Sequence, residues 1–304
     1  MSTPGGFVSA NARKILQTER YALFAVIFFM VVPYFAWLSV AILALVTLKN
    51  GWRQGLVLVL PAMTAHMVVL LWSTGVHLAL LDSCFRVIPC YIAANVLRET
   101  QHWRLVSLFF LVLTACTAAA MHGFFPKFVG LQYLYFQGYL KQMDGGSGAL
   151  NILDQPGFSV IFKANLLFGI QELSMVVVSL ISLLFARSMQ SKLVYPEGFR
   201  HELLNFRGDW QTLLILLALI GASCAGNAIA INSLPLTFFY FALFGLSFSA
   251  HVFAQMKPFR VLILLGLPCV LLPLLALPFY MMLGCFDSVF NFRLFLASNS
   301  GKKS

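Results

Sequence analysis

Residues 67–97 read MVVLLWSTGVHLALLDSCFRVIPCYIAANVL, which joins the end of one apolar run, 55–74, to a second run, 76–97. A bilayer offers the backbone no hydrogen-bond partners, so apolar runs of roughly 20 residues form closed helices. The stretch therefore predicts two membrane-spanning helices joined by a short turn. Asp82 and Arg86 lie inside the second helix, where charged side chains are rare.

The composition of the whole chain also indicates a protein that lies in a lipid bilayer. Of 304 residues, 60% are hydrophobic and only 10% are charged, and the mean hydropathy is +0.87. These values lie far outside the range of soluble domains. We expect an all-α, polytopic transmembrane helical bundle in contact with a lipid bilayer.

The net charge of +10 has a topological explanation. The Lys and Arg residues cluster in short connecting segments, which is typical of cytoplasmic loops, and they do not form a stripe interleaved with aromatic residues. The sequence therefore predicts no nucleic-acid partner. It predicts a cytoplasmic N-terminus.

The apolar runs determine the number of expected spans. The first run contains Pro33 and is too long for one untilted pass, so it forms either one kinked helix or a hairpin. A hairpin keeps Lys49 and Arg53 on the cytoplasmic side, in agreement with the positive-inside rule, so we expect a hairpin and nine spans. A single pass would give eight. The runs are 21–48, 55–74, 76–97, 105–124, 161–186, 211–231, 236–255 and 261–283.

The expected organisation is one transmembrane domain, 21–283, between a cytoplasmic tail, 1–20, and a C-terminal tail, 284–304. An outer aromatic and Gly-rich loop at 125–160 is either an interfacial anchor or a lid. A cytoplasmic loop at 187–210 is expected to be a solvated connection. The proline-rich run at 261–283 either crosses the membrane or re-enters it.

Ionisable groups inside the expected spans are the candidate site. Asp82 and Arg86 stand at i and i+4 with the acid first, which favours a helical ion pair. The pair either fixes helix packing or serves a ligand. The inferred topology places five polar residues from four helices in the outer half of the membrane: His66, Asp82, Arg86, Glu172 and Asn227.

Polar groups converging in an apolar cleft are typical of a small-solute pocket, and the five residues are the predicted ligand-binding set. The same residues could relay protons through His66 and Glu172, or could only hold helices together. No catalytic or nucleotide-binding motif is present, and the six cysteines lack metal-ligand spacing. We therefore expect no enzyme activity, cofactor or metal site.

Two alternatives to a solute-binding role remain open. Small residues at 114–120 and 221–230 allow close helix packing, so the chain could be a non-transporting scaffold that assembles with other membrane proteins. A membrane enzyme acting on lipid-linked substrates is the third reading. It lacks a nucleophile or metal motif.

Two regions resemble a known family. LSVAILALVTLKNGWRQGLVLVLPAM at 38–63, FRHELLNFRGDW at 199–210 and the closing LGCFDSVFNFR at 283–293 resemble the YybS-type bacterial integral membrane proteins, with Gly284, Asp287 and Arg293 on the family's closing pattern. That family is distantly similar to the substrate-binding components of energy-coupling-factor transporters. The resemblance implies a bacterial inner-membrane protein with an outward solute pocket and, as a possible partner, a transporter energising module. The first helix lacks the small-x-x-x-small stripe through which those components dock.

Overall fold

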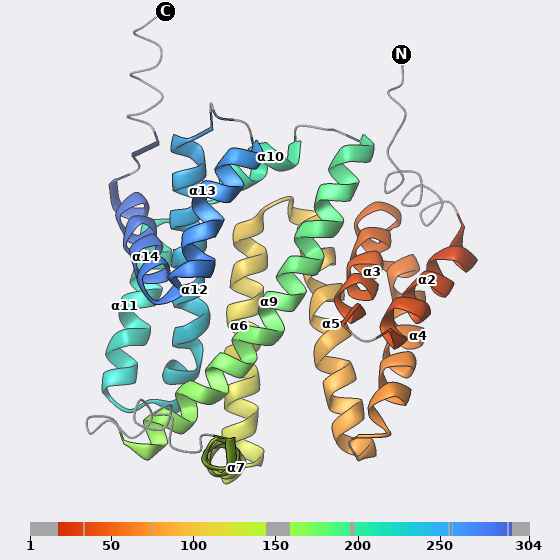
Figure 1. Ribbon diagram of the computed structural model, residues 1–304, viewed down its shortest axis with the longest axis horizontal. Coiled ribbons are helices and arrows are strands. Elements are labelled where there is room, and N and C mark those ends of the chain that lie inside the picture. Colours follow the sequence, from red (N-terminus) through yellow and green to blue (C-terminus); the bar gives the residue numbers. More distant parts are fainter. Residues whose placement is uncertain are drawn as a thin grey trace, which may run out of the picture. The chain divides into compact units, whose positions relative to one another are not determined.

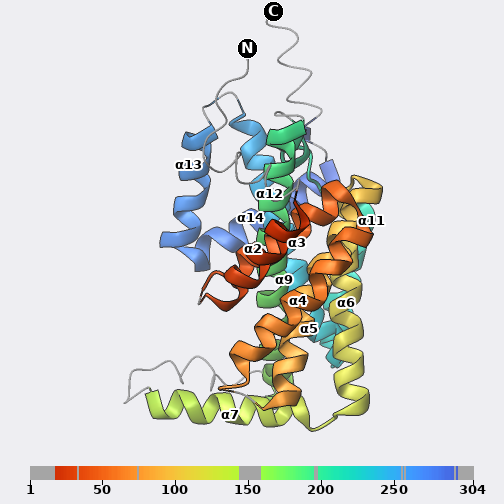
Figure 2. The same cartoon turned by 90° about the vertical axis from the view of Figure 1, so that its right-hand side faces the viewer.

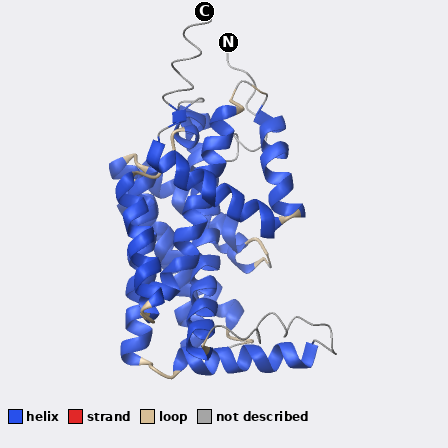
Figure 3. Cartoon of the chain, turned by 90° about the vertical axis from the view of Figure 1, so that its left-hand side faces the viewer, coloured by secondary structure: helices blue, strands red, loops and turns tan. Residues whose placement is uncertain are grey.

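The protein is described here by a computed structural model, which covers residues 18–32, 34–73, 75–143, 159–194, 198–254, 256, 258–290 and 292–293. Within these ranges every regular element is a helix (Figures 1 and 3). The helices are α2 (Glu19–Val31), α3 (Ala36–Asn50), α4 (Trp52–Leu70), α5 (Val76–Thr100), α6 (Trp103–Phe124), α7 (Phe128–Met143), α9 (Val160–Val194), α10 (Gly198–Leu204), α11 (Trp210–Cys224), α12 (Ala228–Val252), α13 (Pro258–Leu271) and α14 (Pro273–Phe290).

Six of the described helices are long and apolar enough to cross a membrane: α4, α5, α6, α9, α12 and α14. Three shorter apolar helices, α3, α11 and α13, accompany them. The chain is therefore an all-α, multi-pass membrane protein, as predicted. The expected count of eight to nine spans exceeds these six, because α2, α3 and α11 have only 13, 15 and 15 residues and are too short to be counted as spans.

The first apolar run forms two helices and not one. α2 has 13 residues and α3 has 15, which at a rise of about 1.5 Å per residue gives lengths of about 20 and 22 Å. The two helices pack together, and the Ser39 hydroxyl donates to the Val26 carbonyl at 2.7 Å. The predicted hairpin is thus present, but each arm is shorter than the roughly 30 Å of a hydrocarbon core.

The last apolar run is also divided. α13 ends at Leu271 and α14 begins at Pro273, because proline cannot donate the helical hydrogen bond that would continue α13. α14 then extends to Phe290, seven residues beyond the expected end of the run at 283. The predicted C-terminal tail therefore begins as helix.

The runs 211–231 and 236–255 imply a turn at 232–235, and this expectation is wrong. These residues lie inside α12, which tolerates Pro235, and the chain turns instead at 225–227. Gly226 adopts a φ of +82°, which a residue without a Cβ reaches at little cost. The Asn227 side chain then accepts a hydrogen bond from the Ala230 amide at 3.1 Å and caps α12.

Both expected loops contain helix. α9 continues through Val194, and α10 follows at Gly198–Leu204, so that much of the expected loop at 187–210 is ordered. The expected outer loop at 125–160 contains α7, which runs crosswise to the end of α6 (Figure 2). The Gly-rich part of that loop, 144–158, lies outside the described residues.

α7 is amphipathic in its packing. Val129 and Tyr133 are buried against Ala164 and Phe168 of α9, whereas Tyr135 on the other side is 79% exposed. An interfacial helix keeps one edge on the protein and offers aromatic rings to the headgroup region. The interfacial anchor and the lid both stay predictions.

The chain divides into two compact units. The first consists of Met1–Phe110 and Ser174–Leu203, and the second of Leu111–Leu173 and Leu204–Ser304. The expected single domain at 21–283 stays a prediction. Most of the expected tails, 1–17 and 294–304, lies outside the described residues.

Glycines bring α12 and α14 together in the second unit. A Cβ built on Gly245 would overlap the Tyr280 carbonyl, and one built on Gly284 would overlap the Phe241 carbonyl. Helices in membranes associate through such small residues because the backbones can then approach closely. α12 and α14 thus form the central packed pair of the second unit.

Candidate functional site

Three of the five predicted site residues lie together in the first unit. His66 is on α4, and Asp82 and Arg86 are on α5. One Asp82 oxygen, Oδ2, lies 3.7 Å from His66 Nδ1 and 3.5 Å from Arg86 Nη2. The i, i+4 pairing predicted from the sequence is therefore present, with an imidazole added from the neighbouring helix.

The helices hold His66 more firmly than the two charged residues. His66 Nδ1 lies 3.1 Å from the Ser83 hydroxyl, which itself donates to the Ala79 carbonyl at 2.7 Å. The His66 side chain is only 7% exposed, whereas the Asp82 and Arg86 side chains are 35% and 34% exposed. The cluster thus has a fixed imidazole and two accessible charges.

The charged contacts of this cluster leave hydrogen-bonding capacity unused. The separations of 3.5 and 3.7 Å are those of ion pairs and exceed ordinary hydrogen-bond lengths. Arg86 Nε is buried and has no hydrogen-bond partner among the described residues. Pro89 lies inside α5 and cannot donate to the Phe85 carbonyl one turn earlier, which adds an acceptor nearby.

The other two predicted residues belong to the second unit. Glu172 on α9 is 9% exposed, and its Oε1 accepts a short hydrogen bond from Thr117 on α6. Asn227 uses its side-chain oxygen to cap α12, which is a structural role that the sequence analysis missed. That all five residues line one pocket stays a prediction.

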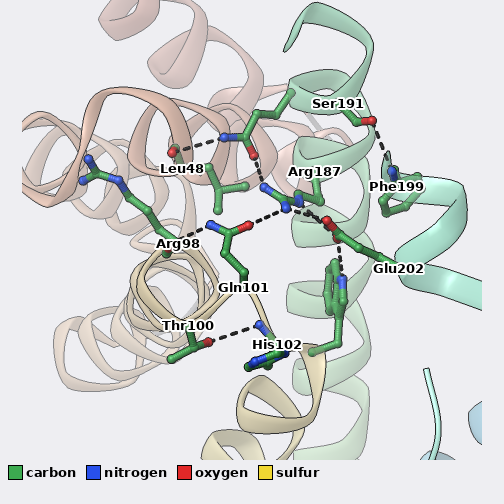
Figure 4. A network of polar contacts seen from close by, with 11 residues as sticks. Leu48, Arg98, Thr100, Gln101, His102, Arg187, Ser191, Phe199 and Glu202 are labelled. Carbon is green, nitrogen blue, oxygen red and sulfur yellow. Dashed lines mark hydrogen bonds and ion pairs between the residues drawn. The ribbon is translucent and has the colours of Figure 1, made fainter. Parts of the chain in front are cut away.

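A partly buried ionic network in the first unit was not predicted (Figure 4). Arg187 of α9 forms a bidentate pair with Glu202 of α10, with Nε to Oε2 at 3.1 Å and Nη2 to Oε1 at 2.5 Å. The Trp103 indole donates to the same carboxylate at 3.0 Å. The expected solvated connection is therefore wrong at this point, because paired charges and the indole hold α10 against α9 and the start of α6.

Amides complete this network. Arg187 also donates to Gln190 Oε1 at 2.8 Å and to Gln101 Oε1 at 2.6 Å. Gln190 in turn donates to the Leu48 carbonyl at 3.3 Å, and Figure 4 shows these contacts joining α3, α5 and α9. All three nitrogens of the Arg187 guanidinium thus donate hydrogen bonds.

The second unit contains an ionic network that is more deeply buried. It joins the connection after α10 to the end of α14. Asp287 is fully buried, and Arg293 Nε donates to its Oδ2 at 3.0 Å. Arg293 also donates to the carbonyls of Leu204 and Phe206 and to the Ser247 hydroxyl. Burial lowers the pKa of the Arg293 guanidinium, and the charge of Asp287 opposes that shift.

The sequence contained a signal for this network. Asn-Phe-Arg occurs at 205–207 and again at 291–293, which is too short to indicate a duplication. The arginines of the two tripeptides converge: Arg207 Nε donates to the Asp287 backbone carbonyl at 3.1 Å, and Arg293 binds the Asp287 carboxylate. Two of the positions that carry the family resemblance, Asp287 and Arg293, are therefore packing residues.

A groove in the first unit lies between α2, α3 and α4. It encloses about 240 Å³ and has a polar rim formed by Glu19, Arg20, Asn50 and Gln54 above apolar side chains. None of the five predicted site residues lines it. Among the described residues, no group of three or more His, Cys, Asp or Glu side chains is placed to hold a metal ion.

Comparison of the chain with protein-family models, with curated proteins and with solved structures gives no match. The proposals below are therefore based on the geometry of the described residues.

Proposed function

We propose that this multi-pass protein of the bacterial inner membrane binds a small polar solute, as a solute-binding or transporter component. The observation that supports this function is the His66–Asp82–Arg86 cluster, in which two accessible opposite charges stand beside a fixed imidazole. The outward pocket implied by the family resemblance agrees with this role.

The arginines of the other two ionic networks are bonded differently from Arg86. Arg187 and Arg293 use their guanidinium nitrogens on carboxylate, carbonyl and amide oxygens of the protein, as expected of arginines that fix helix packing. Among the described residues, Arg86 has a single ion-pair contact, to Asp82 at 3.5 Å. A charge kept in a membrane helix with this little compensation points to a ligand.

The cluster suits a solute that carries both donor and acceptor groups. A guanidinium binds a carboxylate or another planar acceptor, while the Asp82 carboxylate accepts from an amine or hydroxyl group. His66 can donate or accept, depending on its tautomer. Small zwitterions such as amino acids satisfy all three groups at once.

Thermal unfolding of the purified full-length protein tests this assignment. A panel of amino acids, monocarboxylates and amines is added one compound at a time to wild type, to Asp82→Asn and to a control, Glu99→Gln, which changes an exposed carboxylate on the same helix. We expect one chemical class to raise the midpoint of wild type and of the control but not of Asp82→Asn. Equal shifts in all three proteins, or no shift with any compound, would contradict the proposal.

Affinity purification through a tag on the N-terminus tests the transporter context. Recovery of an ATPase pair with a coupling subunit would support a transporter component. The scaffold alternative is favoured by one observation: the end of α11 is exposed, and a Cβ on Gly221 would meet no atom within 4 Å. If the chain is a scaffold, Gly221→Leu should reduce the amount of partner protein recovered, whereas Asp82→Asn should leave that amount unchanged.

A further inference from the structure

Three side-chain oxygens buried in the second unit accept no hydrogen bond from any described group. They are Asn165 Oδ1 and Glu172 Oε2 on α9, and Asn232 Oδ1 on α12. The three residues are 2%, 9% and 1% exposed. Buried polar atoms without partners are uncommon and costly, and three acceptors of one kind on two helices call for a shared explanation.

The three residues occupy one region of the unit. Asn165, Gly169 and Glu172 follow one another at i, i+4 and i+7, so they share a face of α9. A Cβ on Gly169 would lie 2.9 Å from the Asn232 carbonyl carbon, which places Asn232 against α9 between the other two. Along the helix axis the set spans about 10 Å.

The remaining polar atoms of these side chains are already in use. Thr117 donates to Glu172 Oε1, and Asn165 Nδ2 donates to the Ile161 carbonyl at 2.9 Å. Asn232 Nδ2 lies 3.3 Å from His122 Nε2. Each amide nitrogen thus has a partner within the protein, whereas the three oxygens have none among the described residues.

A proline adds a fourth acceptor. Pro235 lies inside α12 and has no N–H to donate to the carbonyl of Ile231, one turn earlier and next to Asn232. Carbonyls freed inside membrane helices are used to coordinate cations in transporters whose helices are broken. The acceptor groups available in this region are therefore one carboxylate, two amide oxygens and one backbone carbonyl.

The charge of Glu172 indicates what such a set would bind. No described Lys, Arg or His lies within ion-pair distance of Glu172, and a lone carboxylate buried in a membrane is strongly disfavoured. Hard oxygen donors favour alkali and alkaline-earth cations. A divalent ion is normally held by several carboxylates, and only one is present here.

We propose that Asn165, Glu172 and Asn232 form a site for one monovalent metal cation of the size of Na⁺. The cation neutralises Glu172 and is coordinated by the amide oxygens, with the Ile231 carbonyl as a further ligand. This site lies in the second unit and does not depend on the proposed solute function of the His66–Asp82–Arg86 cluster.

Na⁺-dependent stability of the full-length protein in detergent tests the site. The midpoint of thermal unfolding is measured by tryptophan fluorescence in NaCl and in choline chloride at equal ionic strength. We expect wild type to gain at least about 2 °C in NaCl, saturably, because a ligand that binds only the folded state stabilises it. Glu172→Gln and Asn232→Leu should lose this gain, while the exposed-carboxylate control Glu99→Gln and the solute-cluster variant Asp82→Asn should keep it.

Binding of ²²Na⁺ to wild type and to Asn165→Leu gives a second measurement in case Glu172→Gln fails to fold. We expect Asn165→Leu to weaken binding by about tenfold, the effect of losing one charge-assisted contact. Equal midpoints of wild type in NaCl and choline chloride would overturn the proposal. So would a midpoint that depends on pH but not on Na⁺, because a proton would then neutralise Glu172.

Discussion

Replacing Gly245 by alanine tests the close approach of α12 and α14. A Cβ at Gly245 would lie 2.7 Å from the Tyr280 carbonyl carbon, whereas ordinary contact begins at 3.4 Å. The Tyr280 carbonyl oxygen is nearer still to that Cβ, so the helices must separate locally by more than about 0.7 Å, since these atoms belong to the backbone and cannot rotate away. The matching change at Gly284 would meet the Phe241 carbonyl carbon at 3.1 Å.

The expected loss follows from two opposing effects. Overpacking of a tight interface costs about 1 to 3 kcal/mol, and a clash between two backbones belongs at the upper end. Alanine recovers about 1 kcal/mol in helix propensity relative to glycine. We therefore expect Gly245→Ala to lower the free energy of unfolding by about 2 kcal/mol, which corresponds to about 4 to 8 °C in the midpoint.

The assay is thermal unfolding in detergent, with Gly221→Ala as the matched control. Gly221 is also helical, but a Cβ there would meet nothing within 4 Å, so this variant should gain up to about 1 kcal/mol. Opposite signs for the two variants are the expected result. A Gly245→Ala protein as stable as Gly221→Ala would refute the close packing of α12 and α14.

Three further predictions concern buried or partly buried contacts and use the same unfolding assay. Arg187→Met should cost about 3 kcal/mol because the carboxylate of Glu202 is left half-paired, and adding Glu202→Met should cost less than the sum of the single changes. Asp287→Leu or Arg293→Met alone should each cost about 3 to 5 kcal/mol, and the double variant should recover much of that loss; equal losses in single and double variants would contradict the pairing. Tyr133→Ala should release α7, with a loss of about 3 kcal/mol and faster proteolysis between α6 and α9; unchanged proteolysis would argue against the packing of α7.

The apolar runs predicted most helices because lipid allows the backbone few alternatives. The i, i+4 spacing also predicted the Asp82–Arg86 pair, since that relation depends only on the helix itself. The turn between α11 and α12 was misplaced because Asn232 and Pro235 are typical of turns. The left-handed Gly226 and the Asn227 cap gave the competing signal, and they end α11 and begin α12.

Contacts between helices could not be predicted in the same way. Arg187 and Glu202 are separated by the end of one helix and the start of another, so no periodicity relates them. The equal membrane depth of Glu172 and His66 suggested a shared site, but depth does not fix which face of a helix each residue occupies. Within the second unit, Glu172 has the partner Thr117 on α6, which no sequence pattern indicated.

The burial of α12 has a consequence for how the bilayer contacts this protein. The most apolar stretch of α12 is 67% buried, against 22% for that of α6, which is the more hydrophobic of the two. A lipid-soluble photoreactive reagent should therefore label α6 and α13, where Leu262 is 70% exposed, and leave α12 almost unmarked. The apolar side chains of α12 pack against other side chains and not against lipid. Exchanges among Leu, Ile and Phe, which lipid-facing helices accept, should therefore be poorly tolerated in α12.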